Sequence, residues 1–239
     1  MKVRIRFRKT GPVRFIGHLD VMRYFQKLIR RAGLPVAYSA GFHPHQIMSF
    51  AQPLGVGLES MAEYADVEMT EDISGEEAVR ALNAVSAPGI EIVSVRQLPE
   101  GSRTAMSIVA AAAYRIRFSE ALWERLAAGE PALSPEGLPV AWDAFLSRET
   151  IPVVKKTKKS EETLDLKPFL FASEADAEGE IFFLVQAGSE RNIRPEMPAG
   201  EFLKGFGAEA GPADLKITRL DLYARGEDGR LVSLEEMGA

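Results

Sequence analysis

Strict alternation of apolar and basic residues at the start of the chain constrains its fold most strongly. In residues 2–8, KVRIRFR, Val3, Ile5 and Phe7 fall on one side of an extended segment, and lysine or arginine falls on the other. Successive side chains of a β-strand point to opposite faces, so this spacing predicts a strand with one face in a core. The opposite face is expected to lie open and basic, carrying Arg4, Arg6 and Arg8.

A change of period after this strand predicts a helix over residues 18–32, where apolar residues recur at helical spacing until the AGLP sequence ends the pattern. The extended piece VAYS follows, and AEYADVEMT and IEIVSVRQL predict two further strands. The segment between those two strands predicts a second helix, which would open with a capping box formed by Ser74 and Glu77.

The resulting order, β-α-β-β-α-β over residues 1–104, is typical of a ferredoxin-like fold, with two helices on one face of an antiparallel sheet. YRIRF at residues 114–118 then echoes VRIRF at residues 3–7 and opens a second, irregular unit over residues 105–239. Duplication explains this echo, and simple strand alternation explains it equally well. We therefore expect an α+β protein of two ferredoxin-like units with antiparallel sheets.

The charge is distributed unevenly along the chain. The net charge is −5, yet residues 1–31 hold ten lysines and arginines against one acid, Asp20, a local charge of +9. Because local potential steers binding more than net charge does, a basic surface facing an anionic partner is expected. A track for RNA phosphates would comprise Arg4, Arg6, Arg8, Arg14, Arg23, Lys27, Arg30, Arg31, His43, His45, Lys155, Lys156, Lys158, Lys159, Arg191 and Arg194.

Each part of this track has a simpler interpretation. Asp20 could complement the helix dipole and pair with Arg23 or Arg14, and the KKTKK run at residues 155–159 could be a solvated hairpin tip. Aromatic residues that could stack on bases, Phe42, Tyr24 and Phe50, have an apolar spacing that is more typical of a core.

The connection SAGFHPHQIMSFAQPLGVGLES, residues 39–60, is long, polar and rich in glycine and proline. Ordering such a segment costs about 1–2 kcal/mol per residue in backbone entropy, so we interpret residues 41–59 as a preformed element that faces a ligand. His43 and His45 flank Pro44 and, with His18, could bind zinc. They could equally bond to the backbone or contact phosphates and bases.

Catalytic signals are weak. The absence of cysteine excludes thiolate metal sites and a cysteine nucleophile, and nucleotide-binding, zinc-protease and deaminase motifs are missing. His18, His43, His45 and Asp20 remain candidates for acid–base cleavage of RNA. We expect a binding protein rather than an enzyme, without a cofactor, located in the cytoplasm and not associated with a membrane, since no apolar run is long enough to span one.

The pieces HLDVMR, RRAGLP, GFHPH, SFAQPLGVGLES and EYADVE, together with LDLKPFL and IRPE further on, resemble the radical-SAM-linked protein family, a bacterial domain of unknown function. Members of that family occur alone or fused to B12-binding radical SAM proteins, and they are often encoded beside ribonuclease G. The resemblance implies an RNA-binding accessory module that presents tRNA or rRNA to a separate radical SAM enzyme for RNA modification. An RNA-processing enzyme and a protein–protein adaptor are the alternatives.

Overall fold

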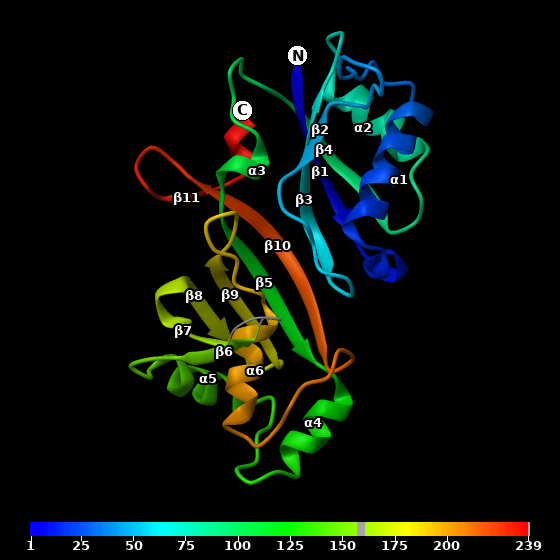
Figure 1. The fold of residues 1–239 in the computed structure, drawn as a ribbon. Helices are drawn as coiled ribbons and strands as arrows, with labels where there is room; N and C mark the ends of the chain where they lie inside the picture. The colour runs from blue at the N-terminus through cyan, green and yellow to red at the C-terminus, as the bar shows by residue number, and fades with distance from the viewer. Residues whose placement is uncertain (157–160, 239) are drawn as a thin grey trace. The chain divides into compact units, whose positions relative to one another are not determined.

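The computed structural model describes residues 1–156 and 161–238. The chain is an α+β protein with mostly antiparallel sheets, as expected, and it divides into two compact units (Figure 1). The first comprises Met1–Ala112, Gly188–Glu190 and Arg219–Ala239, and the second comprises Ala113–Ala187 and Arg191–Thr218. This division places the first boundary after Ala112 and not at residue 104. It also assigns Arg219–Ala239 to the first unit.

The first unit has the expected split βαβ order. Strand β1 is antiparallel to both β3 and β4, and β2 pairs with β3, so the strands run β4-β1-β3-β2. Its elements are β1 (Lys2–Lys9), η1 (Gly11–Phe15), α1 (His18–Arg31), β2 (Met48–Phe50), β3 (Glu59–Glu68), α2 (Gly75–Ala84), β4 (Ile90–Leu98), α3 (Ala105–Ile108), β11 (Leu231–Ser233) and η3 (Glu236–Gly238).

The core of this unit lies between the sheet and helices α1 and α2. Val3, Ile5 and Phe7 are buried there, which confirms the predicted apolar face of the first strand. The Phe7 ring packs on Phe25 of α1 with centroids 4.5 Å apart. Burying a large apolar side chain contributes about 1.5–3 kcal/mol, so this interface fixes α1 and leaves its other face to solvent.

Two local expectations in this unit are wrong. Ser74 occupies the N-cap of α2, but its side chain makes no capping hydrogen bond in the described structure. The VAYS piece forms only isolated bridges, Val36 with Met69 and Tyr38 with Gln46. The strand beside β3 is instead β2, which lies inside the segment expected to be a loop.

The second unit repeats the same order, with a hairpin inserted. Its strands run β10-β5-β9-β8, the split βαβ arrangement again, and β6 pairs with β7 in a separate two-stranded sheet. Strands β5 and β10 contribute residues to both units. The elements are β5 (Val109–Phe118), α4 (Glu120–Ala127), α5 (Leu138–Leu146), β6 (Pro152–Lys156), β7 (Glu161–Asp165), η2 (Lys167–Phe169), β8 (Leu170–Ala175), β9 (Glu180–Gln186), α6 (Glu196–Lys204) and β10 (Leu215–Arg225).

Among the residues described, no helix is both long enough and apolar enough to cross a lipid bilayer.

Candidate nucleic-acid interface

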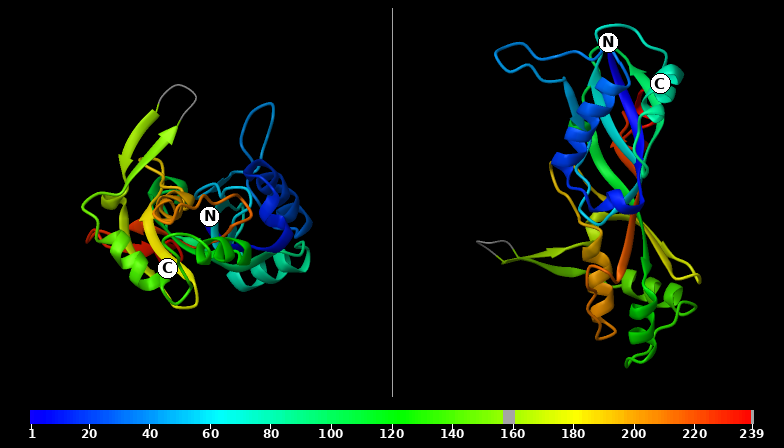
Figure 2. Two further views of the ribbon diagram at one scale, coloured as in Figure 1. Left: turned by 90° about the horizontal axis from the view of Figure 1, so that it is seen from below. Right: turned by 90° about the vertical axis from the view of Figure 1, so that its right-hand side faces the viewer.

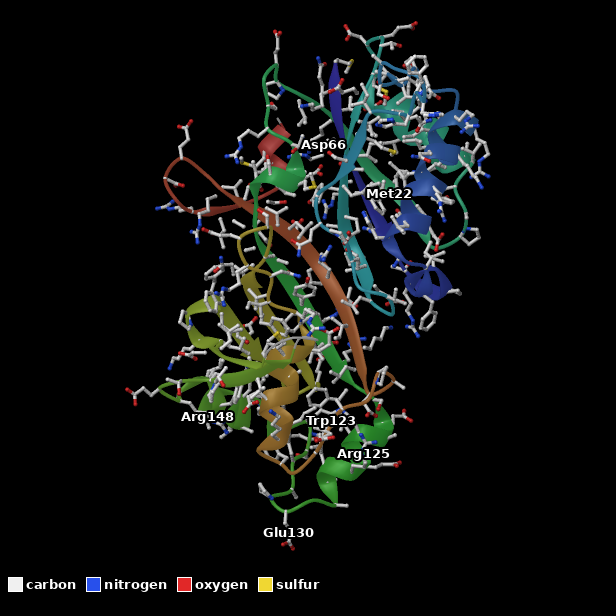
Figure 3. All side chains as sticks on the ribbon, viewed as in Figure 1. Met22, Asp66, Trp123, Arg125, Glu130 and Arg148 are labelled. Atoms are coloured by element: carbon white, nitrogen blue, oxygen red, sulfur yellow. The ribbon has the colours of Figure 1, made fainter. Side chains whose placement is uncertain are left out.

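The second face of the first unit's sheet is covered, and the expectation of an open basic face is wrong. Arg4 is only 3% exposed. Its Nε and Nη2 donate to the Asp66 carboxylate at 2.8 and 3.2 Å, and its Nη1 donates to the Leu234 carbonyl at 3.2 Å. The Ala105 backbone N–H also donates to Asp66, at 2.7 Å. Arg4 is therefore a buried structural cation and not a phosphate contact. Figure 3 labels its partner Asp66, on β3, and Met22, on α1.

The other two arginines of β1 are only partly exposed on this side of the sheet. Arg6 is half-buried and lies opposite Tyr64, whose hydroxyl donates to Asp221 at 2.5 Å. Arg8 Nη1 is 2.9 Å from the Glu91 carboxylate. Acids of β3 and β4 thus pair with Arg4 and Arg8, and none of the three arginines is fully exposed, so β1 does not form the expected open phosphate track.

Part of the connection between α1 and β3 is structural. Arg219 of β10 is buried and donates through Nη1 to both carboxylate oxygens of Glu63, at 2.8 and 3.0 Å. It also donates to the carbonyls of Gln52 and Pro53, each at 3.3 Å. Residues 52 and 53 are therefore bonded to a buried ion pair, so this half of the segment has a structural role.

Lys9 lies beside this ion pair and is itself buried. Its ammonium group donates to the carbonyls of Arg14 and Ile16, at 3.2 and 3.1 Å, and so holds the turn before α1. Burial lowers the pKa of Lys9, Glu63 opposes this effect, and Arg219 adds to it. The lysine has a structural task, and its charge faces the protein interior.

His18 is half-buried beside this ion pair. It lines a cavity of about 10 Å³ together with Lys9 and Glu63, and its ring meets the Phe50 ring edge-on at 5.5 Å. A cavity of that size is at the lower limit for one water molecule. Asp20, the other catalytic candidate near the start of α1, is exposed and pairs with Arg23 at 3.3 Å, which is the simpler interpretation offered above.

The exposed face of α1 carries the densest set of cations in the first unit. Arg23, Lys27, Arg30 and Arg31 are all exposed, at positions i, i+4, i+7 and i+8 of the helix. Residues at this spacing form one stripe, here about 12 Å long. In the part of the chain that the structure describes, Lys27, Arg30 and Arg31 form no ion pair. We call these four residues the α1 stripe.

A hairpin spanning residues 38–46 lies beside this helix (Figure 2). Gln46 is buried at its base, and its side-chain amide donates to the Gln26 carbonyl of α1 at 3.1 Å. Gln26 lies three residues after Arg23 and four before Arg30, so the hairpin is attached next to the α1 stripe. We call residues 38–46 the hairpin.

Both histidines of the hairpin, His43 and His45, are exposed, and the His45 ring is hydrogen-bonded within the hairpin. The Ser39 hydroxyl lies 2.8 Å from Nδ1 of His45 and accepts a hydrogen bond from the His45 backbone N–H at 3.1 Å. His43 and His45 lie on the hairpin, whereas His18 begins α1. In residues 1–156 and 161–238, no three or more His, Asp or Glu side chains form a group that could hold a metal ion.

The remaining members of the expected track belong to other elements of the two units. Arg14 is half-buried, 3.7 Å from the Glu59 carboxylate, with its guanidinium 4.8 Å from the Phe15 ring centroid. In the second unit, Arg191 stacks on Phe169 at 4.7 Å, and Arg194 is exposed. The backbones of Lys155 and Lys156 are part of β6, and Lys158 and Lys159 lie outside the described residues.

The comparison with known families shows which family the chain belongs to. A family model described as "uncharacterized protein conserved in bacteria" (DUF2344) matches residues 2–195. The chain belongs to this family. The match spans the first unit's βαββαβ core and continues into the second unit as far as the start of α6. No curated protein matches the chain.

The sequence predicts the cations of α1 and the histidines of the hairpin, but not the roles of Asp66, Glu63 and Arg219. A signal for one of them was present: in AEYADVE, Tyr64, Asp66 and Glu68 share the face opposite Ala65 and Val67. Asp66 lies on the face of β3 opposite Ala65 and Val67. A buried cation on the neighbouring strand, here Arg4, requires an acid on that face.

Proposed function

We propose that this protein binds RNA through the α1 stripe of its first unit. The observation that carries the proposal is the set of exposed cations Lys27, Arg30 and Arg31, which lack acidic partners among the described residues in a chain whose net charge is negative. Arg4 and Arg8 pair with acids within the fold and Lys9 is buried, so much of the exposed positive charge of the N-terminal segment lies on α1. Such a stripe favours a phosphate backbone.

A purely structural reason explains the stripe only in part. Arg30 and Arg31 lie in the last turn of α1, where cations complement the helix dipole and contribute about 0.3–1 kcal/mol each. Arg23 and Lys27 lie outside that turn, so the dipole does not account for them. A phosphate-binding role accounts for all four.

We further propose that the bound RNA, a tRNA or an rRNA, is presented to a separate B12-binding radical SAM enzyme. This part rests on the resemblance of the chain to the radical-SAM-linked proteins. The chain has no cysteine with which to hold an iron–sulfur cluster of its own, so the radical chemistry would belong to the partner.

An RNA-processing enzyme using His18, His43 and His45 is the second candidate, and a protein adaptor the third. The structure gives the enzyme little support, because the His18 ring packs against Phe50 and the other two rings lie on the exposed hairpin. A general acid and base need to reach the same substrate atoms within hydrogen-bond distance or through one water.

The test is a salt titration of RNA binding. A variant with Lys27→Gln, Arg30→Gln and Arg31→Gln keeps good helix formers and removes three charges. Fluorescence anisotropy with a labelled 20-nucleotide RNA should show affinity at least about 10-fold weaker at low salt. The slope of log affinity against log salt should flatten by about 0.7 for each lost phosphate contact to a single strand.

A matched control removes the same number of charges from elsewhere in the first unit: Arg80→Gln, Arg103→Gln and Arg230→Gln, all at exposed positions. It should leave both the affinity and the slope close to those of the wild type. Equal losses in the two triple variants would mean that only net charge matters. An unchanged stripe variant, or no binding by the wild type, would refute RNA binding through α1.

A further inference from the structure

The hairpin presents one aromatic ring entirely to solvent. Phe42 at its tip is fully exposed, at 101%, and is the most exposed large apolar side chain among the described residues. Its neighbours in the tip, Ala40, Gly41, His43 and Pro44, are exposed too, so the ring has no cover from its own segment. Burial of this ring against a bound partner would remove a large apolar area from water and so favour binding.

The backbone beneath this ring is fixed. The Ser39 backbone N–H donates to the His45 carbonyl at 2.8 Å, and the Ser39 hydroxyl bonds both to the backbone and to the ring of His45. Gly41 takes φ = +110°, a conformation that side-chain-bearing residues rarely adopt, and Pro44 restricts the returning arm. A ring held on a closed hairpin loses less conformational entropy on binding than one on a free loop.

The hairpin that carries Phe42 is attached to α1, the helix that carries the α1 stripe. The buried amide of Gln46 lies within 3.5 Å of the Tyr38 hydroxyl and donates to Gln26 of α1, which fastens both arms of the hairpin to the helix. Figure 2 shows the hairpin projecting beside α1. A ligand that contacts Phe42 therefore has the cations of α1 within its reach.

We propose that Phe42 stacks on an unpaired base of single-stranded RNA while the α1 stripe binds its phosphates. This inference rests on the proposed function and adds the substrate class. Aromatic stacking combined with a cationic track is the usual way to bind single strands. In duplex RNA the bases are already stacked inside the helix and the major groove is too narrow for side chains, so a ring at a hairpin tip gains nothing there.

Two other occupants share part of this chemistry: an anionic lipid surface and an apolar pocket on a protein. RNA is favoured because the tip carries a single large apolar side chain, with the polar rings of His43 and His45 close to it in the sequence. Binding to a membrane surface requires a broader apolar face. Stacking on an RNA base requires only one exposed aromatic ring.

The experiment compares Phe42→Ala with wild-type protein, using a 20-nucleotide single-stranded RNA and a 20-base-pair RNA duplex as probes. Loss of one stacked base should weaken single-strand binding by about 10-fold or more and leave duplex binding unchanged. In Phe42→Trp, a base stacked on the new indole should quench its fluorescence. Trp123 and Trp142, both in the second unit, supply the background to subtract.

Phe15→Ala is the control, because Phe15 is an exposed ring whose face is already occupied by the Arg14 guanidinium. It should bind both probes as the wild type does. If Phe42→Ala binds the single strand normally while the stripe variant does not, the stacking inference is wrong and the proposed function survives. If neither variant changes binding, both fail.

Two further results would overturn the inference. In the first, Phe42→Ala loses binding to phosphatidylserine vesicles but keeps its RNA affinity. In the second, it loses the interaction with a purified radical SAM protein, again with unchanged RNA affinity. Either result would assign the ring to a different occupant.

Discussion

Arg4 of β1 and Asp66 of β3 stand opposite each other in the sheet and form a two-bond ion pair, with Nε 2.8 Å and Nη2 3.2 Å from the carboxylate oxygens. The second unit has a related arrangement: Arg115 and Arg117 of β5 both pair with Glu180 of β9. In each unit the first arginine of the repeated phrase, Arg4 or Arg115, meets an acid on the third strand of the βαββαβ order. The echo between VRIRF and YRIRF thus extends to the pairing of its first arginine.

Asp66→Ala is expected to destabilise the protein by about 3–5 kcal/mol, because it leaves the buried Arg4 charge without its partner. It also removes the acceptor of the Ala105 N–H. Urea denaturation followed by circular dichroism measures the change. Glu91→Ala, which breaks the exposed pair with Arg8, is the matched control and should cost no more than about 1 kcal/mol. Similar losses in the two variants would contradict the buried role of Asp66.

Much of the fold follows from local patterns. The apolar phase of residues 3–7 specifies the side of β1 that faces the core, and that side is the one found buried. The helical spacing of Leu19, Met22, Phe25, Ile29 and Ala32 was correct only in part. Phe25 and Ile29 are buried, whereas Leu19 is exposed and the buried side also includes Val21 and Leu28. The connection after α1 was less predictable. Its polar residues and glycines suggested one loop, whereas β2 and the carbonyls that bind Arg219 make its second half part of the packed structure.

The covered sheet face could not be read from the sequence, because its contacts join residues far apart. Arg4 bonds to Leu234, and Glu63 bonds to Arg219, across separations of 230 and 156 residues. Alternation shows that Arg4 lies opposite the core side of β1, but it does not show what covers that side. The exposed cations of α1 were predictable, because a helix that buries its apolar face against the sheet exposes its opposite face to solvent.

Stability at alkaline pH should depend on Tyr64. Burial raises the pKa of Tyr64, and the neighbouring Asp221 carboxylate, which accepts its hydroxyl hydrogen bond, raises it further. Above pH 10, where unfolded tyrosine loses its proton, the folded protein keeps it. The contribution of Tyr64 is therefore constant below about pH 10 and is lost as the pH rises beyond that value.

Tyr64→Phe tests this dependence. At neutral pH the variant should be less stable by about 1–3 kcal/mol, because Asp221 loses a hydrogen bond. Between pH 9 and 11, its free energy of unfolding should fall less steeply than that of the wild type. Tyr223, whose pKa is also raised by burial and by Asp221, should preserve part of the slope. Parallel curves for the two proteins over this pH range would show that Tyr64 does not retain its proton on folding.

Gly89, at the turn before β4, is expected to tolerate no side chain. It has φ = +91°, and a Cβ atom there would lie 2.5 Å from the Thr10 carbonyl oxygen and 2.8 Å from a Val13 methyl group. The Thr10 N–H also donates to the Gly89 carbonyl at 2.9 Å, so the two segments cannot separate without losing a hydrogen bond.

Gly33, which follows α1, is the matched control for Gly89, because its φ is +69° and no atom lies within 4 Å of a Cβ built there. Gly33→Ala should cost only the backbone strain, about 1–2 kcal/mol. Gly89→Ala adds a collision with backbone and should cost clearly more, seen as a lower urea midpoint and a lower melting temperature at an unchanged m-value. Equal losses in the two variants would mean that the turn before β4 can move away from Thr10, and that the close approach of these segments is not needed for the fold.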